Sequence, residues 1–169
     1  MPGNQAEVPA AVEQYLISLF SSAGELGGAI GGSIGGGLSG QGRAGRSGGA
    51  RGGARGGARA ARRMKTVVEQ RAGTVPGTAA EAAARLLAAF PRARQLPAGD
   101  RLRLAVPVGL TGLQQIVIDF ACGPPGDGGA PATVCGYGKE GLLSRKPTRT
   151  VTDQAWSALT AGPPGQPLV

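Results

Sequence analysis

The sequence predicts an α+β fold: a small antiparallel sheet of about three strands with flanking helices, preceded by an N-terminal helix, a glycine-rich segment of period four and a disordered Gly/Arg-rich linker. Three observations lead to this prediction. Most large apolar side chains lie after residue 65, two stretches there alternate apolar and polar residues, and residues 24–63 consist largely of Gly, Ala and Arg. We therefore divide the chain into residues 1–40, 41–65, 66–161 and a frayed tail, 162–169.

Apolar residues near the N-terminus recur at three- and four-residue spacing, which predicts an amphipathic helix over about residues 6–22. They are Val8, Val12, Tyr15, Leu16, Leu19 and Phe20. Two interpretations remain open. The helix docks on the downstream domain or on a second copy, or it lies on a membrane or opens a membrane span.

Glycine recurs at every fourth position between residues 24 and 40. The line consists of Gly24, Gly28, Gly32, Gly36 and Gly40. The segment resembles the glycine zippers of membrane-associated proteins, in which small residues let helices approach closely, and this resemblance implies a helix-packing role for the line. Nine of these 17 residues are Gly, and each costs about 1 kcal/mol relative to Ala in a helix. The segment therefore packs against another helix, spans a bilayer together with the preceding helix, or is a flexible loop.

Residues 41–65 are of low complexity, and Gly-Gly-Ala-Arg occurs there three times in succession. We expect a disordered linker because the composition offers no side chains for a core. No acidic residue occurs between Leu26 and Val68, whereas this stretch contains eight bases: Arg43, Arg46, Arg51, Arg55, Arg59, Arg62, Arg63 and Lys65. These residues predict contact with an anionic partner, namely a membrane surface or nucleic acid. The simpler alternative is a flexible spacer.

The region after residue 65 begins with a predicted helix. Thr78 and Glu81 have the spacing of a capping box, residues 79–90 are strong helix formers, and Pro91 ends the segment. A last helix is expected to start at Thr152 or Asp153 and to run through residue 159.

Strands are predicted over residues 101–109 and 115–122, with a third, short strand over 133–138. In the first strand the even-numbered apolar residues face the core, while Arg101 and Arg103 face outward. Pro107 indicates an edge strand or a bulge, because proline donates no ladder hydrogen bond. In the second strand we expect Asp119 to face solvent.

The chain contains no histidine, which excludes a Ser-His-Asp or Cys-His nucleophile pair within one chain and a Cys₂His₂ zinc site. Matches to GxSxG at residues 31–35 and to GxGxxG at residues 35–40 are expected from composition alone, since neither has the required strand context. We expect no catalytic, metal or cofactor site. Cys122 and Cys135 flank a loop between two predicted strands and form a thiol pair if these strands make a hairpin; otherwise they are free thiols.

The first base is Arg43, so the N-terminus lacks the positive region of a cleavable signal peptide. We expect a cytoplasmic protein, peripheral to or anchored in the inner face of the membrane. The resulting hypothesis is a non-enzymatic accessory protein that associates with a membrane or with itself through the N-terminal glycine-rich segment and the basic linker. The alternative is a nonspecific nucleic-acid-binding protein that uses the Gly/Arg-rich arm. No small-molecule ligand is inferred.

Overall fold

A computed structural model describes residues 7–38, 42–109, 114–140 and 146–161, with side chains for all of these except residues 31–38 and 42–46. The chain forms two compact units. The hairpin unit, Val8–Thr66, contains two helices. The sheet unit, which comprises Met1–Glu7 and Val67–Val169, contains the sheet and two further helices. The fold is therefore α+β, as predicted.

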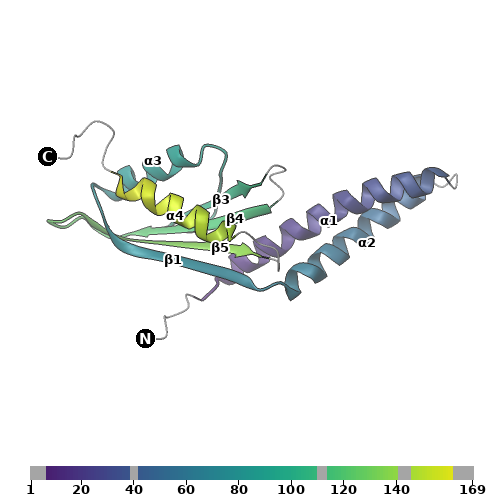
Figure 1. Ribbon diagram of the computed structural model, residues 1–169, viewed down its shortest axis with the longest axis horizontal. Helices are drawn as coiled ribbons and strands as arrows, with labels where there is room; N and C mark the ends of the chain where they lie inside the picture. The colour runs from purple at the N-terminus through teal and green to yellow at the C-terminus, as the bar shows by residue number, and fades with distance from the viewer. Residues whose placement is uncertain (1–6, 39–41, 110–113, 141–145, 162–169) are drawn as a thin grey trace. The chain divides into compact units, whose positions relative to one another are not determined.

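The hairpin unit consists of helices α1 (Ala10–Leu38) and α2 (Gly42–Arg63), which lie side by side in Figure 1. Two expectations are corrected here. The N-terminal helix does not end near residue 22 but continues through the glycine segment, and the predicted disordered linker is helical over residues 42–63. In the part of the chain that the structure describes, no helix is long and apolar enough to cross a bilayer.

Glycine explains how these two helices can pack without large side chains. A Cβ atom added at Gly24 would overlap the carbonyl oxygen of Gly53, and one at Gly28 would overlap that of Gly49. The two backbones are thus in direct contact. Such close approach is available only to the smallest residues, and the Ser21 hydroxyl adds a 3.3 Å hydrogen bond to the Ala54 carbonyl oxygen on the facing helix.

The Gly-Gly-Ala-Arg repeat places one glycine of every repeat against α1. Because its period of four is close to the 3.6 residues of a helical turn, the second glycine of each repeat, such as Gly53, faces α1, whereas the first, such as Gly52, has nothing within 4 Å of an added Cβ. The same alignment of the two helices continues toward the N-terminus of α1, where Ala61 lies opposite Leu16. Both of these residues are buried. The composition that suggested disorder therefore fits a tightly packed helix pair.

The sheet unit contains five strands in the order β1-β5-β4-β3-β2, with antiparallel pairing from β2 through β5. The strands are β1 (Thr66–Val75), β2 (Arg94–Leu96), β3 (Leu102–Val108), β4 (Gln114–Cys122) and β5 (Ala130–Lys139). The predicted count of three strands was wrong. The sequence of β1 does not alternate clearly between apolar and polar residues, and β2 has only three residues, so neither gives a strand signal.

Helices α3 (Ala79–Ala89) and α4 (Pro147–Thr160) cover one face of this sheet (Figure 1). Leu86 and Leu159 from these helices join Leu104, Ile118 and other buried strand residues in the core. The predicted capping box of α3 is confirmed. The Glu81 amide donates to the Thr78 hydroxyl at 3.3 Å, and the Thr78 amide donates to the Glu81 carboxylate at 2.8 Å. The latter bond lowers the pKa of Glu81.

Helix α4 starts at Pro147, earlier than predicted, because the chain before it supplies the capping groups. Lys146 adopts a left-handed conformation with φ of 55°, and the Thr148 amide donates a 2.9 Å hydrogen bond to the Glu140 carboxylate. The helix then packs closely on β5: an added Cβ at Gly136 would overlap the Thr152 hydroxyl, and one at Gly138 would overlap that of Thr148.

Adjacent glycines of α2 provide a matched test of the helix contact. We expect Gly53→Ala to lower the free energy of unfolding of the hairpin by about 1–3 kcal/mol, since the new methyl group forces two backbones apart. Gly52→Ala is expected to raise it by up to about 1 kcal/mol, because the methyl group meets open space and alanine favours a helix. Thermal unfolding followed by circular dichroism at 222 nm measures both, and equal effects of the two substitutions would contradict the packing.

Candidate anionic-surface site

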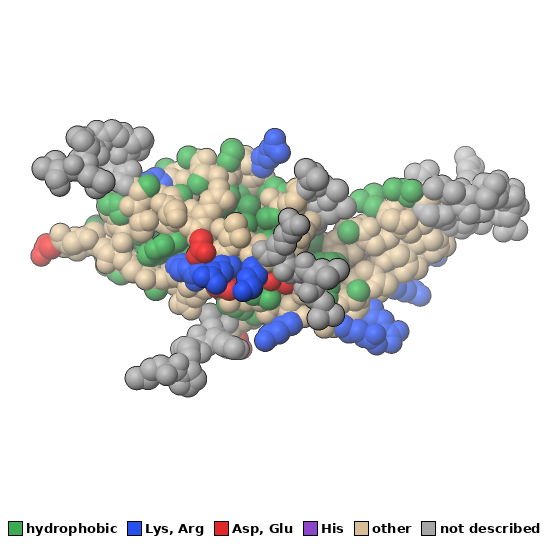
Figure 2. Space-filling view, viewed as in Figure 1, with side chains coloured by type: hydrophobic (Ala, Val, Ile, Leu, Met, Phe, Trp, Pro, Cys, Tyr) green, Lys and Arg blue, Asp and Glu red, His purple; other side chains and the backbone are tan. Residues whose placement is uncertain are grey.

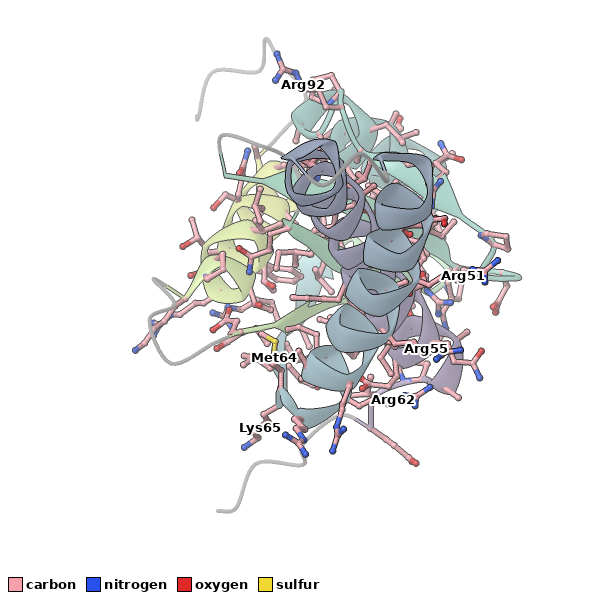
Figure 3. All side chains as sticks on the ribbon, turned by 90° about the vertical axis from the view of Figure 1, so that its right-hand side faces the viewer. Arg51, Arg55, Arg62, Met64, Lys65 and Arg92 are labelled. Atoms are coloured by element: carbon pink, nitrogen blue, oxygen red, sulfur yellow. The ribbon has the colours of Figure 1, made fainter. Side chains whose placement is uncertain are left out.

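The outer side of α2 carries a line of arginines. Arg51, Arg55 and Arg59 are exposed and lie four residues apart, so their attachment points are about 6 Å apart along the helix. Each lies two positions after an interface glycine, which is about 200° around the helix axis, and the line therefore faces away from α1. Arg62, Arg63 and Lys65 are also exposed. Figure 3 shows Arg51, Arg55 and Arg62 projecting from the helix. We call these six residues the cationic edge.

The charges of the cationic edge are not neutralised locally. None of the six side chains makes a hydrogen bond or ion pair within the described part of the chain, and α2 itself contains no acidic residue. The hairpin unit has only Glu13 and Glu25 as acids, and Glu13 accepts a 2.5 Å hydrogen bond from the Thr66 hydroxyl. The uncompensated guanidinium groups create a local positive potential that attracts phosphate and other anions.

Two large apolar side chains are exposed on the opposite edge of the hairpin, and we call this pair the apolar edge. Leu26 and Ile30 on α1 are 58% and 61% exposed, and each follows an interface glycine by two positions. Their side chains therefore face away from α2, on the side opposite to the arginines. Figure 2 shows apolar side chains along one margin of the hairpin and basic ones along the other. A flat surface can contact one of these edges but not both at once.

The remaining predicted site residues are only partly covered by the described structure. Arg43 and Arg46 lie in α2, but their side chains are outside the described set. Gly24 and Gly28 contact α2. Gly32 and Gly36 lie within α1 with surroundings that are not described, and Gly40 lies outside the described residues.

A buried ion pair lies on the face of the sheet opposite to α3 and α4. Arg103 Nη2 and Asp119 Oδ2 are 2.8 Å apart, and the two side chains are 11% and 3% exposed. The expectation that both residues face solvent was therefore wrong. Asp119 Oδ1 and Arg103 Nε have no hydrogen-bond partner. Because both side chains are shielded from solvent, the main effect of the pair is on stability.

The two cysteines do not form the predicted pair. Cys122 lies opposite Ala132 in the β4–β5 register, whereas Cys135 lies opposite Asp119. Because neighbouring positions on a strand point to opposite faces, the two thiols are on different sides of the sheet, and both are free. Burial raises the pKa of each thiol, so both are protonated near neutral pH and are weak nucleophiles.

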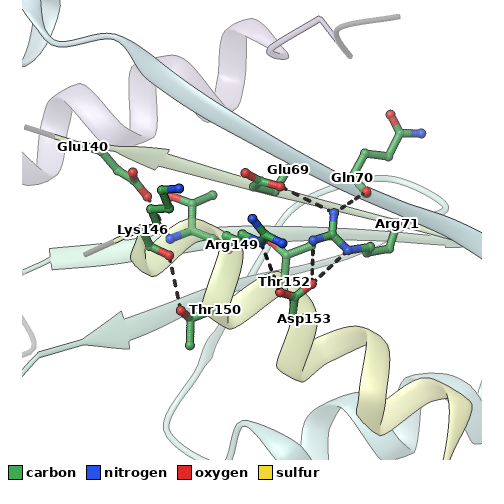
Figure 4. A network of polar contacts seen from close by, with 10 residues as sticks. Glu69, Gln70, Arg71, Glu140, Lys146, Arg149, Thr150, Thr152 and Asp153 are labelled. Carbon is green, nitrogen blue, oxygen red and sulfur yellow. Dashed lines mark hydrogen bonds and ion pairs between the residues drawn. The ribbon is translucent and has the colours of Figure 1, made fainter. Parts of the chain in front are cut away.

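Other polar groups serve the architecture. Arg71 on β1 donates to Asp153 on α4 through Nε at 2.9 Å and Nη2 at 2.6 Å, and Arg149 lies 3.7 Å from the same carboxylate (Figure 4). This network joins an edge strand to a helix. The described residues contain no cluster of three or more residues suited to bind a metal ion.

No protein-family model matches the chain, and neither the curated proteins nor the solved structures contain a significant match.

The buried ion pair gives a prediction that the sequence did not suggest. Asp119→Ala is expected to destabilise the protein by about 3–5 kcal/mol, because it leaves the Arg103 guanidinium buried without its counter-charge. The control is Asp153→Ala, which removes a carboxylate that is 48% exposed and should cost about 1 kcal/mol or less. Urea unfolding measures both variants, and similar midpoints would contradict the difference in burial.

Proposed function

We propose that this protein is a non-enzymatic accessory protein whose helical hairpin binds an anionic membrane surface through the cationic edge. One observation carries the proposal: an unbroken exposed line of Arg51, Arg55 and Arg59, with no acidic residue on the same helix. The absence of histidine from the chain and the raised pKa of both thiols favour a binding role over nucleophilic catalysis.

The expected strength of the interaction is moderate and depends on salt. Each base close to an anionic leaflet contributes about 1 kcal/mol. Three to five bases held at about 6 Å intervals on one helix therefore give reversible binding that weakens as the Debye length shortens with added salt. Arginine suits this role because its planar guanidinium group pairs with phosphate through two hydrogen bonds.

The apolar edge adds a second element to this proposal. When the arginines contact a surface, Leu26 and Ile30 point away from it, because they lie on the other side of the hairpin. These two side chains are then accessible to a second copy of the chain. Membrane contact and self-association are thus compatible in one orientation, each using its own edge.

Nonspecific binding to nucleic acid is the second candidate. The specific observation in its favour is the exposed line of Arg51, Arg55 and Arg59, which suits contacts with phosphate. The cationic edge contains no aromatic residue for stacking on the bases. Such binding would have little sequence preference and a steep dependence on salt.

The test is vesicle co-flotation of the full chain with the triple variant Arg51→Gln, Arg55→Gln, Arg59→Gln. With vesicles of phosphatidylcholine and phosphatidylserine at low salt, we expect the variant to bind about a hundredfold more weakly, from three contacts of about 1 kcal/mol each. The matched control removes the same charge from exposed positions of the sheet unit, Arg94→Gln, Arg101→Gln and Arg149→Gln, and should bind as the wild-type chain does. Vesicles of phosphatidylcholine alone should not bind.

Two results would overturn the membrane proposal. Equal weakening by both triple variants would show that net charge, and not the cationic edge, determines binding. Failure of the wild-type chain to float with acidic vesicles, together with salt-sensitive binding to a random 30-base-pair DNA duplex in a fluorescence anisotropy titration, would favour the nucleic-acid candidate.

A further inference from the structure

A hollow of about 510 Å³ opens in the sheet unit between the C-terminal end of α3, the second half of β3 and α4. Its apolar lining includes Phe90 from the end of α3, Val106 and Val108 from β3, and Val151 from α4. Its volume lies within the range of small-molecule binding sites. It lies wholly within the sheet unit, so its function is separate from that proposed for the hairpin.

The hollow has a clear structural origin. Strand β2 pairs with β3 over only three residues, from Arg94 opposite Ala105 to Leu96 opposite Arg103. The chain before β2 leaves the sheet in a turn closed by a 2.9 Å hydrogen bond from the Ala93 amide to the Phe90 carbonyl oxygen. The last residues of β3 therefore extend beyond β2, and Pro107 lacks the amide that would let another strand pair there.

Two polar side chains among the lining residues have no partner. Arg92 and Gln154 are exposed, and neither makes a hydrogen bond or ion pair within the described part of the chain. Among the described residues, no acidic side chain contributes to the lining. The Arg92 guanidinium is thus an uncompensated positive charge beside an apolar surface.

We propose that this hollow binds a small amphipathic anion. Its apolar body would lie against Phe90, Val106 and Val151, and its carboxylate, sulfonate or phosphate group would pair with Arg92. A guanidinium group binds such anions through charge-assisted hydrogen bonds, and the Gln154 amide offers a further donor. This site could not be predicted from local sequence patterns, because its lining comes from separate elements that only the fold brings together.

Two fluorescent probes of similar shape test the proposal on the full chain. The probe 1-anilinonaphthalene-8-sulfonate carries an anionic group, whereas N-phenyl-1-naphthylamine does not. We expect Arg92→Gln to weaken binding of the sulfonate probe at least tenfold while changing that of the neutral probe less than twofold. Ala89→Phe, which fills the hollow from α3, should weaken both probes at least tenfold, and Val108→Phe fills it from β3 if the first variant does not fold.

The double variant Leu26→Ser, Ile30→Ser is the control, because it removes the exposed apolar residues of the hairpin edge. It should leave the affinity of both probes unchanged. Loss of probe binding in this control, or equal affinity of wild type and Arg92→Gln for the sulfonate probe, would overturn the proposal. Absence of saturable binding to the wild-type chain would also overturn it.

Discussion

The direct contact between the backbones of α1 and α2 is the constraint on which the hairpin depends. Neither helix has enough large side chains to form a conventional core, and their many glycines disfavour an isolated helix in water. The helices are nevertheless stable together because glycine lets their carbonyl oxygens and Cα atoms meet. These contacts involve Gly24, Gly28, Gly49 and Gly53. Contacts of this kind gain dispersion energy and weak Cα–H···O bonds over a long interface. A larger residue at Gly24, Gly28 or Gly53 would separate the helices.

This contact also determines the chemistry of the surface. Once one glycine of each repeat faces the partner helix, the arginine two positions later must face the opposite way. The line from Arg51 to Arg59 and the exposed pair Leu26 and Ile30 are therefore consequences of a single packing choice. Because the apolar edge and the cationic edge lie on opposite sides of the hairpin, we expect each edge to contact a different partner.

Close approach through glycine recurs in the sheet unit. Gly136 and Gly138 make room on β5 for two threonine hydroxyls of α4, and Gly73 on β1 lies against the ring of Trp156, which an added Cβ would meet at 3.0 Å. These contacts position α4 along the sheet, and α4 in turn supplies part of the wall of the hollow beside Arg92. The glycine-rich composition is thus used for packing in both units.

The sequence by itself determined the α+β class, the capping box of α3 and the position of the basic residues, because these follow from local patterns of polarity and charge. Tertiary structure decided the rest. Residues 42–63 became a helix only because a second glycine-rich helix lies against them, and β1 became a strand only beside β5. Asp119 is buried because Arg103 lies in register with it on the next strand. In each case the stabilising partner is distant in sequence, so no local pattern could reveal it.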